Sequence, residues 1–206
     1  MSPSSALRAA ATARNVAGPL LRAAYPTEVW GAHHIPARGP VLIVGEQPEL
    51  LAGALVKAAA PRPVHVIATP PVMQSVPPQL LKAGGDIANV EPGIGAAREA
   101  LRLLDDGAAV LSLGGSPVAG YLAAASGAPI ATVVVLGAAG RVPTDPPALR
   151  RRVEVRFGPA ASLGVSGDPC ALETIRAAGE RSRQRIADAR DEAWARHGGV
   201  DEETVR

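Results

Sequence analysis

Aromatic residues and cysteine are both scarce in this sequence. Phe, Trp and Tyr together make up 2% of the 206 residues, and Cys170 is the single cysteine. So few aromatic rings cannot stack a run of nucleic-acid bases, and a formal net charge of +2 gives no strongly basic surface. A single cysteine excludes a disulfide within the chain, and no signal-peptide pattern opens it. We therefore expect a cytoplasmic protein with no nucleic-acid partner.

Lysine is scarce as well. Lys57 and Lys82 are the only lysines, in a chain rich in arginine, alanine, glycine and proline. This bias is typical of a GC-rich genome and indicates a bacterial protein rather than a particular activity. A chain of 206 residues is long enough for one domain that buries roughly 70% of its unfolded surface.

Charge is missing altogether from residues 107–140. An uncharged run of this length suggests a membrane span, but glycine and proline interrupt it too often for one spanning helix. The pattern instead favours a strand over 108–113, a short helix over 118–125 and a strand over 130–136. Such a βαβ unit, apolar throughout, is typical of a parallel sheet that is buried on both faces.

The stretch 31–51 organises the rest of the chain. Its apolar run 41–44 is short and β-rich and ends at Gly45, which predicts a buried strand that leads into a helix over 49–60. In open α/β sheets the ligand crevice lies where such strands end and the following helices begin. We therefore expect the functional site at this strand end.

The remaining elements alternate in the same way. Strands are predicted over 64–68, 87–90 and 153–157, and helices over 79–83, 94–104 and 171–196. This alternation predicts an α/β fold with a mainly parallel sheet flanked by helices. We divide the chain into an N-terminal basic helical segment (1–25), an α/β core (26–165), and a C-terminal amphipathic helix and tail of the same domain (166–206).

The N-terminal segment carries Arg8, Arg14 and Arg22 and has no acidic residue before Glu28. Proline can begin a helix but cannot continue one, so Gly18-Pro19 predicts a pair of helices rather than one. Its alanine-rich faces supply little hydrophobic driving force. The segment is therefore expected either to pack against the domain or to lie on a membrane surface.

The order of landmarks over 31–159 resembles that of a known family. A glycine, a proline-containing turn and the strand VLIV run into Gly45-Glu46, with Leu51 five positions on. The glycerolipid acyltransferases, in particular the bacterial 1-acylglycerol-3-phosphate (lysophosphatidate) acyltransferases, have here an apolar strand followed by Asn-His-x-x-x-x-Asp. The resemblance implies their fold, and it places Glu46 and Leu51 where the family has its catalytic His and Asp.

The later motifs resemble the family in place but not in chemistry. The strand IANV ends in Glu91, where the resemblance implies a phosphate-binding arginine. The segment LSLGGSP stands where the family has Phe-Pro-Glu-Gly-Thr-Arg, so the equivalent positions are Gly114, Gly115 and Ser116. Scaffold landmarks are retained at 128–130 (Ala-Pro-Ile) and 157–159 (Phe-Gly-Pro).

These replacements remove the family's chemistry. In the family the His takes a proton from the acceptor hydroxyl, whereas a carboxylate with an ordinary pKa near 4 is a poor base, and Leu51 orients nothing. Glu91 would repel an acceptor phosphate by roughly 4 kcal/mol at about 4 Å and an effective dielectric of about 20. The resemblance thus implies a pseudoenzyme, a phospholipid acyltransferase-like protein that binds a lipid, an acyl chain or a protein partner. The alternative is an active acyltransferase with Glu46 as base and a non-phosphorylated acceptor.

Metal and cofactor sites have weaker support. Glu46, Glu49 and Glu91 would suit a cation if they converged, but carboxylates at helix starts also favour the helix dipole. His33-His34 lacks a third ligand and is better read as a turn. The segment 93–97 matches a dinucleotide fingerprint outside its usual first strand-helix unit. We therefore expect no metal and no cofactor.

Ser116 offers one further pattern. Gly114-Gly115-Ser116-Pro117-Val118 nearly forms a nucleophile elbow between a strand and a helix. Its second glycine is replaced by Val118, and His197 is the only histidine that follows. A hydrolase that uses Ser116 is therefore a minor hypothesis.

Membrane contact is expected from charge and resemblance together, because family members act on membrane lipids from the cytoplasmic side. The arginines near an anionic surface would contribute about 1 kcal/mol each. We therefore predict reversible, peripheral attachment at the inner face of the cell membrane through Arg8, Arg14, Arg22, Arg150, Arg151 and Arg152. We also predict that Glu46, Glu91 and Gly114 lie within about 15 Å of one another, around one small-ligand pocket.

Overall fold

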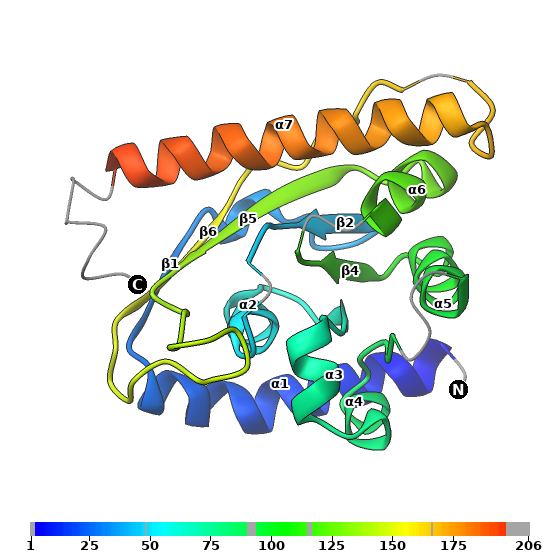
Figure 1. Cartoon of the computed structure of the whole chain (residues 1–206). Coiled ribbons are helices and arrows are strands. Elements are labelled where there is room, and N and C mark those ends of the chain that lie inside the picture. The colour runs from blue at the N-terminus through cyan, green and yellow to red at the C-terminus, as the bar shows by residue number, and fades with distance from the viewer. Residues whose placement is uncertain (1–2, 48, 90–93, 115–116, 166, 197–206) are drawn as a thin grey trace.

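The computed structural model describes residues 3–47, 49–89, 94–114, 117–165 and 167–196. Its centre is a six-stranded sheet in the order β1-β6-β5-β2-β4-β3 (Figure 1). The strands are β1 (Thr27–Trp30), β2 (Val41–Val44), β3 (Val64–Ile67), β4 (Ala109–Ser112), β5 (Ile130–Leu136) and β6 (Val153–Phe157). Neighbouring strands are parallel except β5 with β6. The predicted mainly parallel α/β sheet is confirmed.

Helices cover both faces of the sheet (Figure 1). Helices α1 and α2 lie on one face with α3 and α4 beside them, and α5, α6 and α7 lie on the other. Their bounds are α1 (Pro3–Ala24), α2 (Ala52–Ala59), α3 (Pro70–Ser75), α4 (Pro78–Ala83), α5 (Ile94–Asp105), α6 (Pro117–Ser126) and α7 (Leu172–Arg196), with a 3-10 turn η1 at Ala32–His34. The 3-10 turn η1 confirms the turn that we expected at His33-His34.

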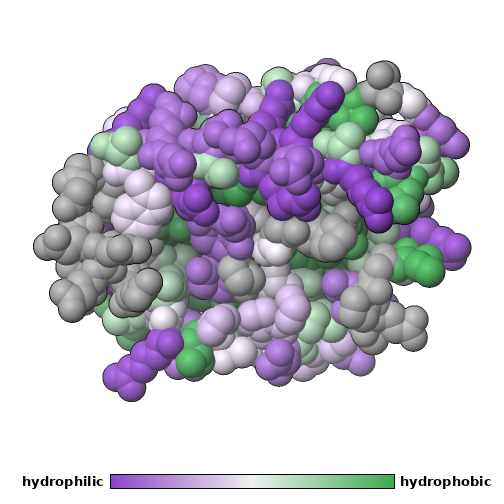
Figure 2. Space-filling model, turned by 45° about the horizontal axis from the view of Figure 1, so that its top comes forward, coloured by the Kyte–Doolittle hydropathy of each residue, from purple (hydrophilic) through white to green (hydrophobic). Residues whose placement is uncertain are grey.

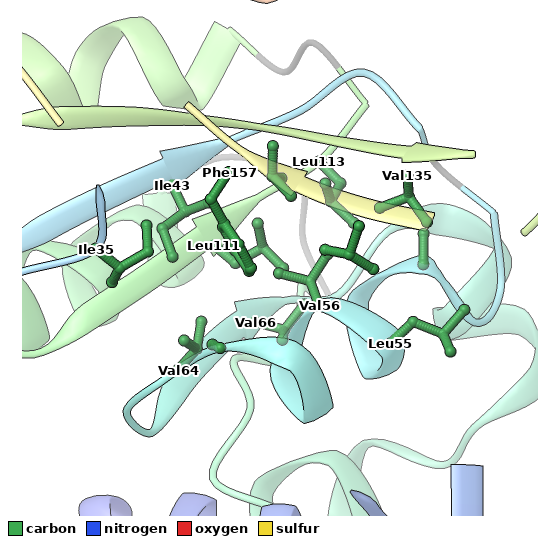
Figure 3. Close-up of a cluster of buried hydrophobic side chains, with 14 of the residues drawn as sticks. Ile35, Ile43, Leu55, Val56, Val64, Val66, Leu111, Leu113, Val135 and Phe157 are labelled. Carbon is green, nitrogen blue, oxygen red and sulfur yellow. The ribbon is translucent and has the colours of Figure 1, made fainter. Parts of the chain in front are cut away.

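Strand β2 shows why two helical layers are needed. All four of its residues are buried. Because side chains alternate along a strand, Val41 and Ile43 enter the cluster under α2, whereas Leu42 and Val44 enter the cluster under α5 and α6. Figure 3 shows the first cluster, in which α2 packs against the sheet. The run VLIV is therefore apolar throughout because both faces of the strand are covered.

Helix α7 closes the second face. Its buried side chains are small or medium-sized: Thr174, Ala178, Ser182, Ile186 and Ala193. A Cβ on Gly120 of α6 would lie 2.8 Å from Cα of Gly179, so these two helices meet backbone to backbone. Figure 2 shows mainly hydrophilic residues on the face over α7.

The predicted break in the N-terminal segment is wrong, because α1 continues through Gly18 and Pro19 as one helix. Pro19 cannot donate to the carbonyl of Asn15, but both residues are exposed, so water can satisfy that carbonyl. Gly18 is buried against α2, where an added Cβ would lie 3.7 Å from Cβ of Ala58. Packing against α2 therefore keeps the helix intact at a position where its local sequence disfavours it.

Two predictions about strands also need correction. The strand predicted over 87–90 is an isolated bridge between Ile87 and Ile67, and Val90 lies outside the described residues. The N–H of Val66 donates to the side chain of Asp86 (3.1 Å) rather than to a backbone carbonyl, so regular pairing does not extend there. Strand β1 was not predicted, because three of its four residues are exposed and it lacks an apolar pattern.

Candidate functional site

The ends of β2 and β4 lie side by side in the sheet. Val44 is opposite Ser112, and the N–H of Gly45 donates to the carbonyl of Ser112 (3.1 Å). A Cβ on Gly45 would lie 2.7 Å from the carbonyl oxygen of Val133, so only glycine fits this close approach. The chain therefore leaves both strands at one edge of the sheet, where Glu46 and Gly114 follow.

Glu46 is held by the other layer of the molecule. Its Oε2 accepts a hydrogen bond from Nη1 of Arg190 on α7 (2.9 Å), and the two side chains are 49% and 40% exposed. Arg190 also contacts the carboxylate of Asp191 at 3.4 Å. The residue predicted to replace the family's base is thus an exposed partner in an ion pair.

The other predicted site positions differ in burial. Leu51 stands directly before α2, half-buried, and packs against the cluster under that helix. Gly114 is exposed, with φ of 81°. Glu91, Gly115 and Ser116 lie outside the described residues, so the proximity of Glu46, Glu91 and Gly114 stays a prediction, as does the role of Ser116.

Two polar side chains of the loop after Glu46 turn inward. Oε1 of Gln47 and Oε2 of Glu49 are buried and have no hydrogen-bond partner among the described residues. Burial raises the pKa of Glu49 above its ordinary value, partly offset by a hydrogen bond from its own backbone. The N–H of Leu50 donates to the carbonyl of Pro143 (3.0 Å), which fixes this loop to the segment after β5.

An apolar pocket begins beside this loop. It has a volume of about 360 Å³ and is lined by Leu50 and Leu51 before α2, and by residues of α1, α2, β3, α3 and α4. Helix α1 contributes Ala17, Gly18 and Leu21. Gly53 and Ala54 keep the wall on α2 thin, since their side chains are absent or small. The rest of the lining is Lys57, Ala58, Val66, Ala68, Val72, Ser75, Val76, Leu81 and Asp86.

Lys57 and Asp86 form a buried ion pair in this lining. Nζ of Lys57 donates to Oδ1 of Asp86 (2.6 Å) and to the carbonyl of Gly84 (2.7 Å). The two side chains are 7% and 19% exposed. Burial raises the pKa of Asp86, and the Lys57 ammonium lowers it in part. Removing two charges from water is costly, so this pair is an unusual feature of an apolar pocket.

His65, a residue of β3, lies near the Lys57–Asp86 pair. It is fully buried, its Nδ1 is 2.6 Å from the carbonyl of Gly85, and its Nε2 has no partner in the described part of the chain. Because a carbonyl only accepts, Nδ1 carries the proton. Burial lowers the pKa of His65, chiefly because a charged imidazole would lose its water.

The sequence prediction missed Lys57, Asp86 and His65. One signal for Lys57 was available, because it is the single charged residue in AGALVKAA, the sequence of α2. A charge within a helix that is otherwise apolar indicates burial with a partner. Nothing in the sequence pointed to Asp86 as that partner, since it follows a glycine turn 29 positions later.

The predicted arginines lie partly together. The N–H of Arg150 donates to the carbonyl of Ala24 (2.8 Å), which joins the segment before β6 to the end of α1. Leu20 (69% exposed), Arg22, Leu149 (76% exposed) and Arg150 are exposed residues of the two segments that meet here, and we call this set the basic-apolar surface.

The remaining arginines differ from one another. Arg152 is paired with Glu28 at 3.4 Å, Arg151 is half-buried, and Arg8 is exposed on α1. The side chain of Arg14 lies outside the description. Within the described part of the chain, no helix is long and apolar enough to cross a bilayer.

Clusters of metal-binding side chains are absent from the described residues, where no three of His, Cys, Asp and Glu come together. The rings of His33 and His34 are 4.2 Å apart between centroids and tilted by 55°, and Nδ1 of His34 is 2.8 Å from the carbonyl of Phe157. The cation site considered for Glu46, Glu49 and Glu91 depends on Glu91, which is outside the described residues, as is part of the 93–97 fingerprint.

A solved structure of similar fold is the crystal structure of the 1-acyl-sn-glycerophosphate (LPA) acyltransferase PlsC from Thermotoga maritima. The match has a TM-score of 0.59 and 17% sequence identity, and it covers 89% of this chain and 79% of that chain. No protein-family model and no curated protein sequence matches the chain. The likeness shows the fold: this chain is an α/β protein with the architecture of that acyltransferase.

Proposed function

We propose that this protein binds a lipid or an acyl chain in the pocket along α2 and does not catalyse acyl transfer. The observation that carries the proposal is the pocket itself, about 360 Å³ and lined mostly by apolar side chains. Ligand pockets typically enclose about 300–1,000 Å³ and are predominantly apolar. A hydrocarbon chain matches such a lining, because it needs few hydrogen bonds and gains from leaving water.

The position of the pocket supports a lipid. Leu50 and Leu51 line it directly after the β2 strand end, where the resemblance places the reacting groups of the acyltransferases. The structural neighbour PlsC is named as an LPA acyltransferase. A chain in this pocket would have its head group at the exposed strand end, near Glu46 and Gly114.

The absence of catalysis rests on the residues at that strand end. Proton removal from a hydroxyl needs a base that is free and suitably tuned. Glu46 is half-exposed and ion-paired with Arg190, and Leu51 cannot orient a base. The alternative, an active acyltransferase with Glu46 as its base, requires that Arg190 first release this carboxylate.

Chain binding is tested by titrating dodecanoate and lysophosphatidate into lipid-free protein and following heat release. Ala54 lines the pocket, so the bulky ring of Ala54→Trp should fill it and weaken binding at least tenfold. The control Ala83→Trp places the same ring on an exposed position of α4 outside the lining and should bind as the natural protein does. Equal affinities in both variants would contradict the proposed site.

Acyl transfer is tested separately. Acyl-CoA or acyl carrier protein as donor, with glycerol 3-phosphate or lysophosphatidate as acceptor, should give no product above the buffer blank. Glu46→His should not restore activity, because the partner groups at Leu51 and Glu91 would still be missing. Turnover that disappears in Glu46→Gln would favour the alternative function.

We also propose that the protein attaches reversibly to anionic membranes through the basic-apolar surface. Support comes from its composition: two exposed leucines and two exposed arginines belong to the segments that meet at the end of α1. Each basic residue near an anionic surface contributes about 1 kcal/mol, which salt weakens. Helix α1 also lines the pocket with Ala17 and Leu21, so the same helix would connect the membrane to the ligand.

Cosedimentation with phosphatidylglycerol vesicles tests this attachment. Binding should fall with added salt and should fall severalfold in Leu20→Ser/Leu149→Ser, two exposed positions whose replacement leaves the core unchanged. A protein that stays in the supernatant at low salt would contradict the membrane hypothesis and favour a protein partner.

A further inference from the structure

The Lys57–Asp86 pair has unused hydrogen-bonding capacity inside the pocket. An ammonium has three donors, and Lys57 uses two, on Gly84 and Asp86. A carboxylate has two oxygens, and Oδ1 of Asp86 accepts from both Lys57 and Val66. Its Oδ2 accepts from no residue within the described ranges. One donor and one acceptor therefore remain, on two neighbouring side chains that line the pocket.

A role limited to holding the fold explains only part of this arrangement. The bonds to Gly84 and Val66 join α2, β3 and the turn after α4, which a structural pair would do. Replacing buried pairs by apolar residues is often neutral or stabilising, so stability alone does not account for charge in an apolar cavity. A purely structural pair would not need the remaining N–H of Lys57 or Oδ2 of Asp86.

The charges of the pair limit what can bind them. Lys57 and Asp86 together carry no net charge, so a carboxylate or an amine placed there would bring an uncompensated charge into a poorly solvated site. A neutral group that both donates and accepts would satisfy Oδ2 and the third N–H together. A hydroxyl is the smallest group that does so.

We propose that the pocket ligand is a hydrocarbon chain with a hydroxyl group that hydrogen-bonds to Lys57 and Asp86. This inference rests on the proposed chain-binding function and adds the chemical class of the ligand. Lys57 is six residues beyond Leu51, roughly 9 Å along the axis of α2 at 1.5 Å per residue. The hydroxyl is thus at the inner end of the chain, away from the strand end.

The test compares matched pairs of probes. Octanoate, decanoate and dodecanoate are titrated against the same acids with a hydroxyl on the terminal carbon, using lipid-free protein. At the best-fitting chain length the hydroxylated acid should bind about tenfold or more tightly than the plain one, because the plain chain would displace water from Oδ2 of Asp86 and the third N–H of Lys57 without replacing its hydrogen bonds. Equal binding, or tighter binding of the plain acid, overturns the inference while leaving the chain-binding function intact.

Two variants test whether the preference for the hydroxylated acid depends on Lys57 and Asp86. Lys57→Met/Asp86→Leu replaces the pair by apolar groups of similar size and should reverse the preference toward the plain acid. Arg102→Ala removes a surface pair with Glu99 and should keep the preference for the hydroxylated acid. Circular dichroism shows that each variant is folded. A preference that survives in the double variant overturns the inference, and failure of both acids to bind the natural protein overturns the inference and the proposed function together.

Discussion

The two ion pairs near the candidate site differ in almost every physical respect. Glu46–Arg190 joins two side chains that are 49% and 40% exposed, at the ends of the strands. Lys57–Asp86 joins two that are 7% and 19% exposed, inside the lining of the pocket. Exposed pairs contribute about 0–1 kcal/mol, whereas breaking a buried pair costs about 3–5 kcal/mol.

This contrast separates the strand ends from the pocket along α2. At the strand ends, where the family pattern has its reacting groups, the structure has a solvent-exposed ion pair and a loop glycine. Along α2, it has an apolar pocket with the Lys57–Asp86 pair in its lining. The architecture of the neighbour PlsC is thus retained in a chain whose notable chemistry lies in the pocket rather than at the strand end.

The largest expected effect is on the buried pair. Lys57→Met keeps the volume of the side chain but leaves the Asp86 carboxylate buried without its cation. We expect the free energy of unfolding to fall by about 3–5 kcal/mol at neutral pH, measured by urea denaturation. Because the folded-state pKa of Asp86 is already raised, acidification protonates this carboxyl in the folded protein, so the loss should shrink as the pH falls.

The double variant Lys57→Met/Asp86→Leu is the control for this effect. It removes the stranded charge and should recover most of the lost stability, as buried pairs replaced by apolar residues generally do. If the single and double variants lose the same stability, then packing of the Lys57 stem, not its charge, holds this region together.

An intermediate effect is expected at His65. Its folded-state pKa lies below the unfolded value of 6.5, so the unfolded chain takes up a proton first as the pH falls. Stability due to His65 is therefore complete above pH 6.5 and is lost below it, by at most about 1.4 kcal/mol per pH unit. His65→Asn, which keeps a donor for Gly85 but cannot titrate, should flatten the dependence of the urea midpoint on pH.

His33→Gln serves as the matched control, because His33 is exposed. This variant should keep the pH dependence of the natural protein. A dependence that is unchanged in His65→Asn would show that other groups dominate, and it would contradict the role given to the buried imidazole.

The smallest effect is expected at the exposed pair. Glu46→Gln removes the charge that faces Arg190, and the midpoint of urea denaturation should move by no more than the equivalent of about 1 kcal/mol. Added salt should weaken even this difference. A loss of stability as large as that in Lys57→Met would contradict the difference between the two pairs. It would show that Glu46 is needed to stabilise the strand end.

The sequence predicted the sheet well because its strands carry strong local signals. VLIV, IATVVVL and VEVRF are β-rich and bounded by glycine or proline, so their existence follows from local pattern. Strand β1 was not predicted from the sequence, because it is an edge strand with exposed residues. The continuity of α1 through Pro19 was not predicted, because it depends on packing against α2. That contact joins residues far apart in the sequence, so local sequence does not show it.

The candidate site was predicted only in part, for the same reason. The loop after β2 was located from a single strand and its glycine. The partner of Glu46 is Arg190, 144 positions away, and the partner of Lys57 is Asp86, 29 positions away. Such pairings depend on how α7 and the 84–86 turn fold back on the sheet, which local periodicity does not encode.

The central claim is that the pocket along α2 holds a hydrocarbon chain. The most direct measurement is native mass spectrometry of the protein as purified, followed by extraction and identification of any bound lipid. Our account predicts a bound lipid or fatty acid in the natural protein and in Ala83→Trp, and none in Ala54→Trp. Protein that carries no chain after gentle purification, and takes up none from added lipid, would contradict it.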